Sequence, residues 1–157
     1  MSLRRFTLLL HAGAIFSGST DEKIICWEYS THNALYAMTG HEGAIVSLAS
    51  NSSYVASSSA DLTIRLWMKH TNVNAVGNVG QQVRVVYGHV KSVLSLQLGE
   101  SWMLSGSADF EVRVWTLSHS SKNSLLVDST NRLKGHECPI TCVSYGSLEV
   151  RVTELKR

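Results

Sequence analysis

Side chains that could form a nucleophile, its base and the group orienting that base recur in this chain of 157 residues. A histidine precedes a serine and then an aspartate at two places, with identical spacing in both. The two sets are His41, Ser57 and Asp61, and then His89, Ser105 and Asp109. A catalytic triad acts at one place, with an exposed serine and an oxyanion hole. Recurrence at the same spacing therefore favours a structural hydrogen-bond network over a hydrolase site.

A tryptophan follows each aspartate at one fixed distance, within three similar phrases. The phrases are SGSTDEKIICW from Ser17 to Trp27, SSSADLTIRLW from Ser57 to Trp67, and SGSADFEVRVW from Ser105 to Trp115. The intervals between Asp21, Asp61 and Asp109 match those between the three tryptophans, which defines a repeat. A buried indole N–H needs an acceptor, and the serine of each phrase supplies it. The serine is then occupied and poorly placed to act as a nucleophile.

Each phrase alternates β-branched and aromatic residues around its aspartate, which predicts a β-hairpin with a tight turn there. With the turn centred just after Asp61, Ser57 is expected directly opposite Trp67. Another apolar strand precedes each hairpin, AIVSLA or SVLSLQL, and a further one, ALYAM or VRVVY, completes the unit. The sequence therefore predicts four strands in each unit.

These features resemble the WD40 repeat family of β-propellers. Gly-His dipeptides precede the hairpins at Gly40-His41 and Gly88-His89, and a third occurs at Gly135-His136. The resemblance implies an all-β fold of four-stranded antiparallel blades in an incomplete, open propeller. One departure is that Glu28, Met68 and Thr116 follow the tryptophans, where the family usually has aspartate.

The family resemblance also implies that a histidine, serine, aspartate and tryptophan of one unit hydrogen-bond in a row. By position this structural network comprises His41, Ser57, Asp61, Trp67, His89, Ser105, Asp109, Trp115, Ser17, Asp21, Trp27 and His136. At the usual spacing, the histidine that belongs with Asp21 would stand at the position of Met1. The aspartate that belongs with His136 would stand at the position of Lys156. The first and last units are therefore expected to have incomplete networks.

We expect WD40 repeats over residues 6–146 and a divergent tail over 147–157. Blade 1 is expected at about 6–39, blade 2 at 40–87, blade 3 at 88–134 and a partial blade 4 at 135–146. Because the repeat breaks at both ends, the chain is interpreted as a fragment, a short isoform or a truncated gene model. Exposed blade edges are expected to make it prone to self-association.

The resemblance points to a non-catalytic scaffold or adaptor that binds other proteins or peptides. Glu42, Lys91 and Glu137, beside the Gly-His dipeptides, are weak candidates for a binding rim, and the loops Met68–Gln82 and Thr116–Leu126 are others. Two alternatives are a substrate-recognition part of a ubiquitin ligase and the propeller portion of a larger enzyme. The positions before the turn aspartates carry no arginine that would pair with a phosphopeptide; they are Thr20, Ala60 and Ala108.

Composition excludes several other classes. A net charge of +2, with scattered basic residues, gives no patch for nucleic acid. No stretch approaches the roughly 20 apolar residues that cross a bilayer, and the run from Phe6 to Leu10 is too short for a signal peptide.

The three cysteines, Cys26, Cys138 and Cys142, are an odd number, which favours reduced thiols and a cytoplasmic or nuclear location. Cys138 and Cys142 lie near His136, but no second ligand pair completes a zinc site, so no metal and no cofactor are expected.

Overall fold

The protein is built from β-strands alone in the part of the chain that the computed structural model describes, residues 7–11, 14–69, 80–119, 125–145 and 150–154. The strands are β1 (Thr7–His11), β2 (Ala14–Gly18), β3 (Ile24–Glu28), β4 (Ala34–Met38), β5 (Ile45–Ser50), β6 (Tyr54–Ser59), β7 (Ile64–Met68), β8 (Gln82–Val86), β9 (Val93–Leu98), β10 (Trp102–Ser107), β11 (Val112–His119), β12 (Leu125–Leu133), β13 (Ile140–Tyr145) and β14 (Val150–Glu154). No helix long and apolar enough to cross a bilayer occurs in these ranges.

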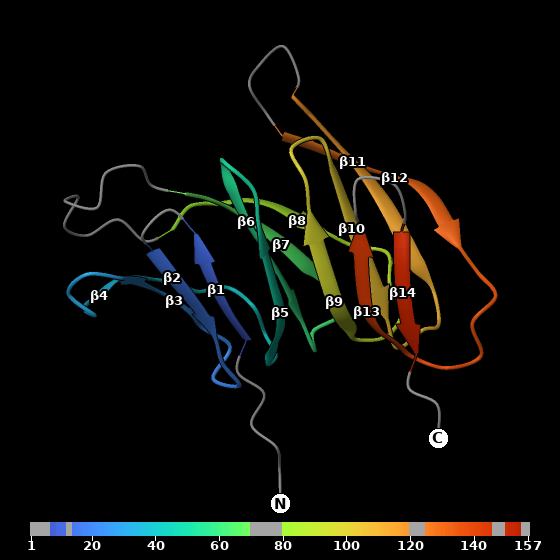
Figure 1. The fold of residues 1–157 in the computed structure, drawn as a ribbon, viewed down its shortest axis with the longest axis horizontal. Helices are drawn as coiled ribbons and strands as arrows, with labels where there is room; N and C mark the ends of the chain where they lie inside the picture. Colours follow the sequence, from blue (N-terminus) through green and yellow to red (C-terminus); the bar gives the residue numbers. More distant parts are fainter. Residues whose placement is uncertain (1–6, 12–13, 70–79, 120–124, 146–149, 155–157) are drawn as a thin grey trace, which may run out of the picture.

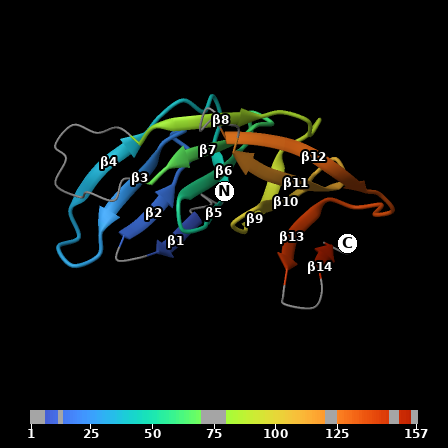
Figure 2. The same ribbon diagram turned by 90° about the horizontal axis from the view of Figure 1, so that it is seen from above.

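The strands form three four-stranded antiparallel sheets and one strand pair, each in sequence order. We call β1–β4, β5–β8 and β9–β12 blades 1, 2 and 3, and β13–β14 blade 4. The blades follow one another along an open arc (Figures 1 and 2). The expected fold class, four-stranded antiparallel blades of an open propeller, is confirmed. Blade 4 includes Val150–Glu154, so a strand lies within the stretch expected as a divergent tail.

The hairpin turns have left-handed residues at equivalent positions. In blade 2 the Leu62 N–H donates to the Ser59 carbonyl at 3.3 Å, between the paired residues Ser58 and Ile64. Leu62 has a φ of 71°, and the equivalent residues Glu22 and Phe110 have 70° and 71°. The Ser59 N–H also donates to the Thr63 carbonyl at 3.2 Å, so the loop is a three-residue hairpin loop whose last residue is left-handed. The residue after the aspartate, and not the aspartate itself, takes the left-handed conformation.

The turn geometry corrects the expected strand register. The turn is centred on Asp61 rather than just after it, so Ser57 pairs with Arg65, and Trp67 pairs with Val55. Side chains two positions apart share a face of a strand. The indole of Trp67 therefore reaches the serine diagonally and not from directly opposite.

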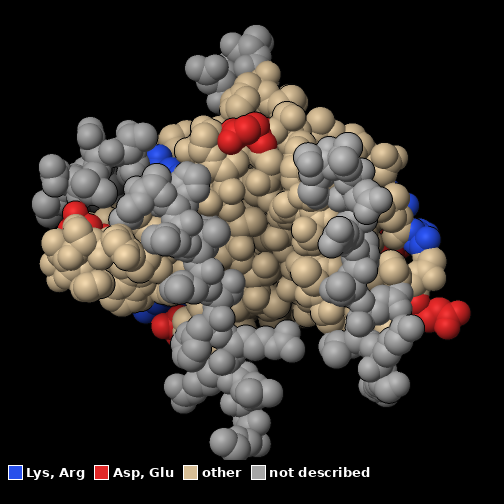
Figure 3. Space-filling view, in the orientation of Figure 1, with Lys and Arg blue, Asp and Glu red and all other residues tan. Residues whose placement is uncertain are grey.

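Apolar side chains between successive blades form the core, because each strand turns alternate residues toward the preceding or the following sheet. Between blades 1 and 2 the buried cluster is Phe16, Ile24, Cys26, Met38, Ile45, Leu48, Val55 and Trp67. Between blades 2 and 3 it is Ala49, Tyr54, Ala56, Ile64, Leu66, Val86, Val93, Leu96, Leu98, Met103, Trp115, Leu117 and Leu125. Between blades 3 and 4 it shrinks to Leu104, Val112, Ile140 and Val143. Charged side chains are sparse on the face shown in Figure 3.

Candidate functional site

The repeated Ser, His and Asp side chains of blade 2 form one hydrogen-bonded row. His41 Nδ1 lies 2.7 Å from Asp61 Oδ2, and His41 Nε2 lies 2.8 Å from Ser57 Oγ. The Trp67 indole N–H donates to the same Oγ at 2.8 Å. The row ties the Gly-His loop before β5 to β6, to β7 and to the turn between these two strands.

Protonation of the row follows from its partners. A carboxylate only accepts, so His41 Nδ1 carries a proton, and in the neutral ring Nε2 accepts from the Ser57 hydroxyl. Burial lowers the pKa of His41, although the bond to Asp61 opposes this shift. Burial alone would raise the pKa of Asp61, but hydrogen bonds from Thr63 and His41 outweigh it and lower the pKa to about 2. Near neutral pH the ring is neutral and the carboxylate is charged, and every donor has an acceptor.

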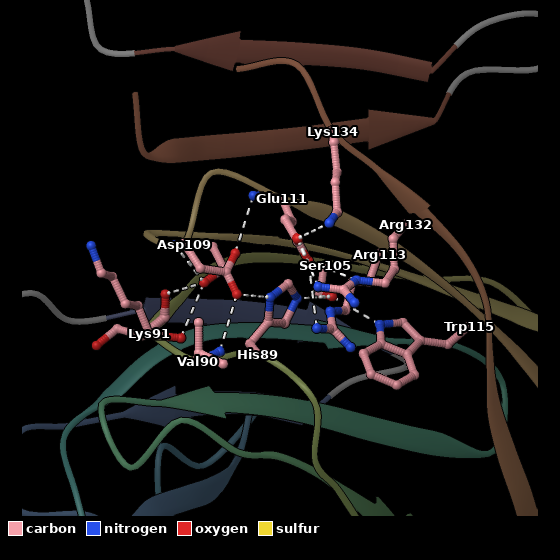
Figure 4. A network of polar contacts seen from close by, with 12 residues as sticks. His89, Val90, Lys91, Ser105, Asp109, Glu111, Arg113, Trp115, Arg132 and Lys134 are labelled. Carbon is pink, nitrogen blue, oxygen red and sulfur yellow. Dashed lines mark hydrogen bonds and ion pairs between the residues drawn. The ribbon is translucent and has the colours of Figure 1, made fainter. Parts of the chain in front are cut away.

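Blade 3 repeats this geometry (Figure 4). His89 Nδ1 lies 2.8 Å from Asp109 Oδ2, and His89 Nε2 lies 2.7 Å from Ser105 Oγ. Trp115 Nε1 donates to that Oγ at 2.8 Å. The second oxygen of each aspartate also binds the turn, since Asp109 Oδ1 accepts from the Glu111 backbone at 3.1 Å.

These contacts connect the same residue types as a catalytic triad does, but the serines are not accessible to a substrate. The hydroxyls of Ser57 and Ser105 point at a histidine nitrogen, as a nucleophile's would. Both serines are 0% exposed, and each Oγ also accepts an indole N–H. A substrate carbonyl cannot reach either oxygen, so the arrangement holds strands together and has no route to acyl transfer.

Among the described residues, parts of the row are seen in the end blades. In blade 1 Trp27 Nε1 donates to Ser17 Oγ at 2.8 Å, while Asp21 accepts from the local backbone of Lys23 at 3.2 Å. In blade 4 His136 is partly buried, and Lys156, at the position expected for its aspartate, lies outside the described residues.

Glycine before His41 and His89 is favoured by backbone conformation, and it also leaves room for an arginine side chain. Gly88 has a φ of 154°, and a Cβ there would lie 2.5 Å from Arg113 Nη1. Gly40 has a φ of 143°, and its Cβ would lie 2.7 Å from Arg65 Nη1. The Gly-His dipeptide therefore lets the histidine approach the row beneath an arginine.

Sequence reasoning missed these two arginines and the ion pairs around one of them. Arg65 and Arg113 stand two positions before Trp67 and Trp115, a repeated Arg-x-Trp pattern that could have identified them. The Arg113 guanidinium lies 5.9 Å from the Trp115 ring centroid, within cation–π range. Glu111, beside Arg113, binds Arg132 through two hydrogen bonds of 2.9 and 2.7 Å.

Comparisons with known proteins agree with this geometry. The sequence profile of the WD40 family, described as "WD domain, G-beta repeat", matches residues 32–68 and 80–116. The chain carries WD40 repeats. Each match starts near the last strand of one blade and ends in the third strand of the next, so the WD40 sequence unit is offset by one strand from the structural blade.

Several solved structures share this fold at low identity. The computationally designed Ika8 protein is 21% identical, with a TM-score of 0.75, and the match covers 94% of this chain and 42% of that one. The designed Ika4 protein is 21% identical at a TM-score of 0.76, covering 97% and 92%. The WD40 repeats of RRP9 are 24% identical at 0.70, covering 87% and 40%. The chain thus spans less than half of the Ika8 and RRP9 chains. A search of curated protein sequences finds no match.

The WD40 rim residues singled out from the sequence, Glu42, Lys91 and Glu137, are all exposed. Lys91 Nζ lies 5.1 Å from the ring centroid of Phe110, so its ammonium is held over the turn of its own blade. The expected binding loop Met68–Gln82 lies largely outside the described residues, at 70–79, and the loop Thr116–Leu126 lies partly outside them, at 120–124.

The three cysteines are free: Cys26 is buried, Cys138 partly buried and Cys142 exposed. Burial raises the pKa of the Cys26 thiol. In the part of the chain that the structure describes, no three His, Cys, Asp or Glu side chains gather as metal ligands would.

Proposed function

We propose that the chain is a non-catalytic scaffold that holds a protein partner on the rim of blade 3. The observation that carries the proposal is the exposure of Tyr87 and Val90, each 73% exposed, on either side of Gly88-His89. Large apolar side chains at such exposure, and aromatic ones above all, are typical of contact surfaces. WD40 repeats commonly form interaction scaffolds, which agrees with this reading.

The rim backbone is held in place before any partner arrives. The Val90 N–H donates to Asp109 Oδ2 at 3.1 Å, and His89 is bound to the same carboxylate oxygen. Lys91 follows, with its ammonium over Phe110. Rigid presentation lowers the entropy that binding costs, so this rim combines exposed apolar area with preorganisation.

The matching positions of blade 2 lack this character. Thr39 stands where blade 3 has Tyr87, and Glu42 stands where it has Val90. Both are exposed, but neither offers apolar area. Blade 2 therefore supplies a matched control, and blade 3 is the proposed contact.

The test compares affinity purification from cytoplasmic and nuclear extracts with three baits. They are the unchanged chain, a Tyr87→Ser and Val90→Asp variant, and a control with Thr39→Ser and Glu42→Gln. The unchanged chain and the control should recover the same partner proteins. We expect the amount of these proteins recovered with the blade 3 variant to be lower by at least about tenfold. Equal recovery on all three baits, with equal thermal stability, contradicts the proposal.

Self-association through blade edges and a location in the cytoplasm or nucleus belong to the same proposal. Light scattering behind size exclusion measures the first, and fractionation of cells expressing the tagged chain measures the second. A serine-reactive fluorophosphonate that labelled Ser57 or Ser105 in the folded chain would contradict the non-catalytic role.

A further inference from the structure

An apolar hollow of about 200 Å³ lies between blade 3 and blade 4. Its walls are Trp102, Leu104, Val114 and Tyr145. Trp102 and Tyr145 meet edge to face with ring centroids 4.8 Å apart. Leu104 is buried, but Trp102 and Val114 remain partly exposed and Tyr145 is 45% exposed.

The same four positions are covered one blade earlier. The residues equivalent to Trp102, Leu104, Val114 and Tyr145 are Tyr54, Ala56, Leu66 and Leu98, and none of these is more than 8% exposed. The side chains that cover them come from the third and fourth strands of blade 3, namely Trp115, Leu117 and Leu125. The hollow therefore lies where a third strand of blade 4 would place its tryptophan.

In the described residues, the two strands of blade 4 fill the first two strand positions. The Val143 N–H donates to Ser95 Oγ at 3.0 Å, as the Leu96 N–H donates to Ser47 Oγ at 3.2 Å one blade earlier. Val143 pairs with Val152, as Leu96 pairs with Ser105. Strand β13 is thus equivalent to β9, and β14 to β10.

The third position beside blade 4 is open in the described structure. In blade 3 the outer edge of β10 pairs with β11. Among the described residues, β14 pairs with β13 alone, so its outer edge presents unpaired backbone groups. Leu104, which lines the hollow, packs in one cluster with Ile140 and Val143 of β13. Tyr145, which also lines the hollow, pairs with Val150 of β14.

We propose that this edge and hollow receive an extended segment of a partner protein, which adds to β14 as the third strand of blade 4. The backbone of such a strand supplies ladder hydrogen bonds, and pockets for alternate side chains supply selectivity. The seat is separate from the rim of blade 3, so the two proposals fail independently.

The register predicts the chemistry of the segment. Met103 pairs with Trp115 in blade 3, and Val150 of β14 stands at the position of Met103. The residue that pairs with Val150 is therefore a large aromatic one, whose ring enters the hollow. In β11, Trp115 and Leu117 are buried on either side of the exposed Thr116. By analogy, the segment has an aromatic residue, then a polar one, then an apolar one.

A strand fits this place better than a second copy of the chain does. Blade 1 of a second copy does present partly exposed Ile15 and Trp27 on the matching face. However, seating its β3 in the hollow would bring its β1 and β2 onto the place of β13 and β14. A single added strand needs no such displacement.

The chain's own third strand serves as the probe. A labelled peptide of sequence FEVRVWTLSH, residues 110–119, is titrated into the 157-residue chain and followed by fluorescence anisotropy. We expect saturable binding that weakens at least about tenfold when the peptide's tryptophan is replaced by alanine, since the buried ring dominates the contact. Hydrogen exchange of the complex should protect β14.

Variants of the hollow complete the test. Val114→Phe fills it and should weaken peptide binding at least about tenfold, while Val90→Asp on the rim should leave binding unchanged. If Val114→Phe does not fold, Tyr145→Ser, which removes a wall at a partly exposed residue, carries the same expectation. The proposal is overturned by no binding at millimolar peptide, by binding indifferent to the aromatic residue and to the hollow, or by a dimer whose protection spans β14 and blade 1.

Discussion

Blades 1 and 2 contain the same strand, turn and strand, and they differ in what surrounds the tryptophan. Trp27 and Trp67 each donate at 2.8 Å to the serine that opens their own phrase. Trp67 is 1% exposed because blade 1 covers it, whereas Trp27 remains partly exposed. His41 joins Ser57 to Asp61, while Asp21 caps its own turn. The hydrogen bond from tryptophan to serine is thus made within the hairpin itself. The stability of the hairpin depends in addition on the loop and the sheet that precede it.

Truncation of the two tryptophans should show the largest difference between the blades. Trp67→Ala is expected to cost about 3–5 kcal/mol of unfolding free energy, because it opens a cavity between two blades. Trp27→Ala should cost less than half of that, since part of its ring already contacts solvent. Urea unfolding followed by circular dichroism measures both. Equal losses would show that the hydrogen bond to serine, and not coverage by a neighbouring sheet, sets the stability.

Removal of the row's polar groups should rank next. Asp61→Ala leaves the His41 N–H and the Thr63 hydroxyl without their acceptor inside the fold, which costs about 2–3 kcal/mol. Asp21→Ala removes contacts at an exposed turn and should cost about 0.5–1 kcal/mol. The same urea titration reads both variants. A cost for Asp21→Ala as large as that for Asp61→Ala would mean that the turn contacts, and not the histidine row, matter.

Acid should destabilise the blades that contain histidine rows. The pKa values of His41 and His89 are lowered from 6.5 by burial, so the unfolded chain binds protons first as the pH falls. Their contribution is intact above pH 6.5 and is lost as the pH falls from there toward the folded-state values. Each histidine can add at most about 1.4 kcal/mol per pH unit to the slope.

Asp61 adds a second, more acidic loss. Its pKa is lowered from 3.8 to about 2, so its contribution is present above pH 3.8 and disappears as the pH falls toward 2.

Unfolding free energies measured from pH 8 to pH 5 on the unchanged chain and on His41→Asn isolate the histidine effect. The variant should show a shallower slope, and parallel curves would refute the neutral-histidine assignment.

Much of this comparison could be predicted from sequence, because the anchors recur at fixed offsets. The WD40 resemblance implied a row of His41, Ser57, Asp61 and Trp67, and hydrogen bonds join these four side chains. The strand register was wrong because the turn conformation depends on a left-handed residue after the aspartate, which has no sequence signature at Leu62. The hollow beside Trp102 was beyond prediction, since it depends on which neighbouring strands are present and not on the local sequence.

The smallest expected effect tests whether the turns themselves are equivalent. Glu22 and Leu62 have nearly the same left-handed φ, 70° and 71°, in blades that differ in burial and hydrogen bonding. Glycine adopts this conformation without steric strain, although it loses more chain entropy on folding. Glu22→Gly and Leu62→Gly should therefore each stabilise the fold by about 0.5–1 kcal/mol, as measured by thermal unfolding. Similar gains in stability from the two variants would show that blades 1 and 2 differ outside the turn. A gain from the blade 2 variant alone would show that the turns themselves differ.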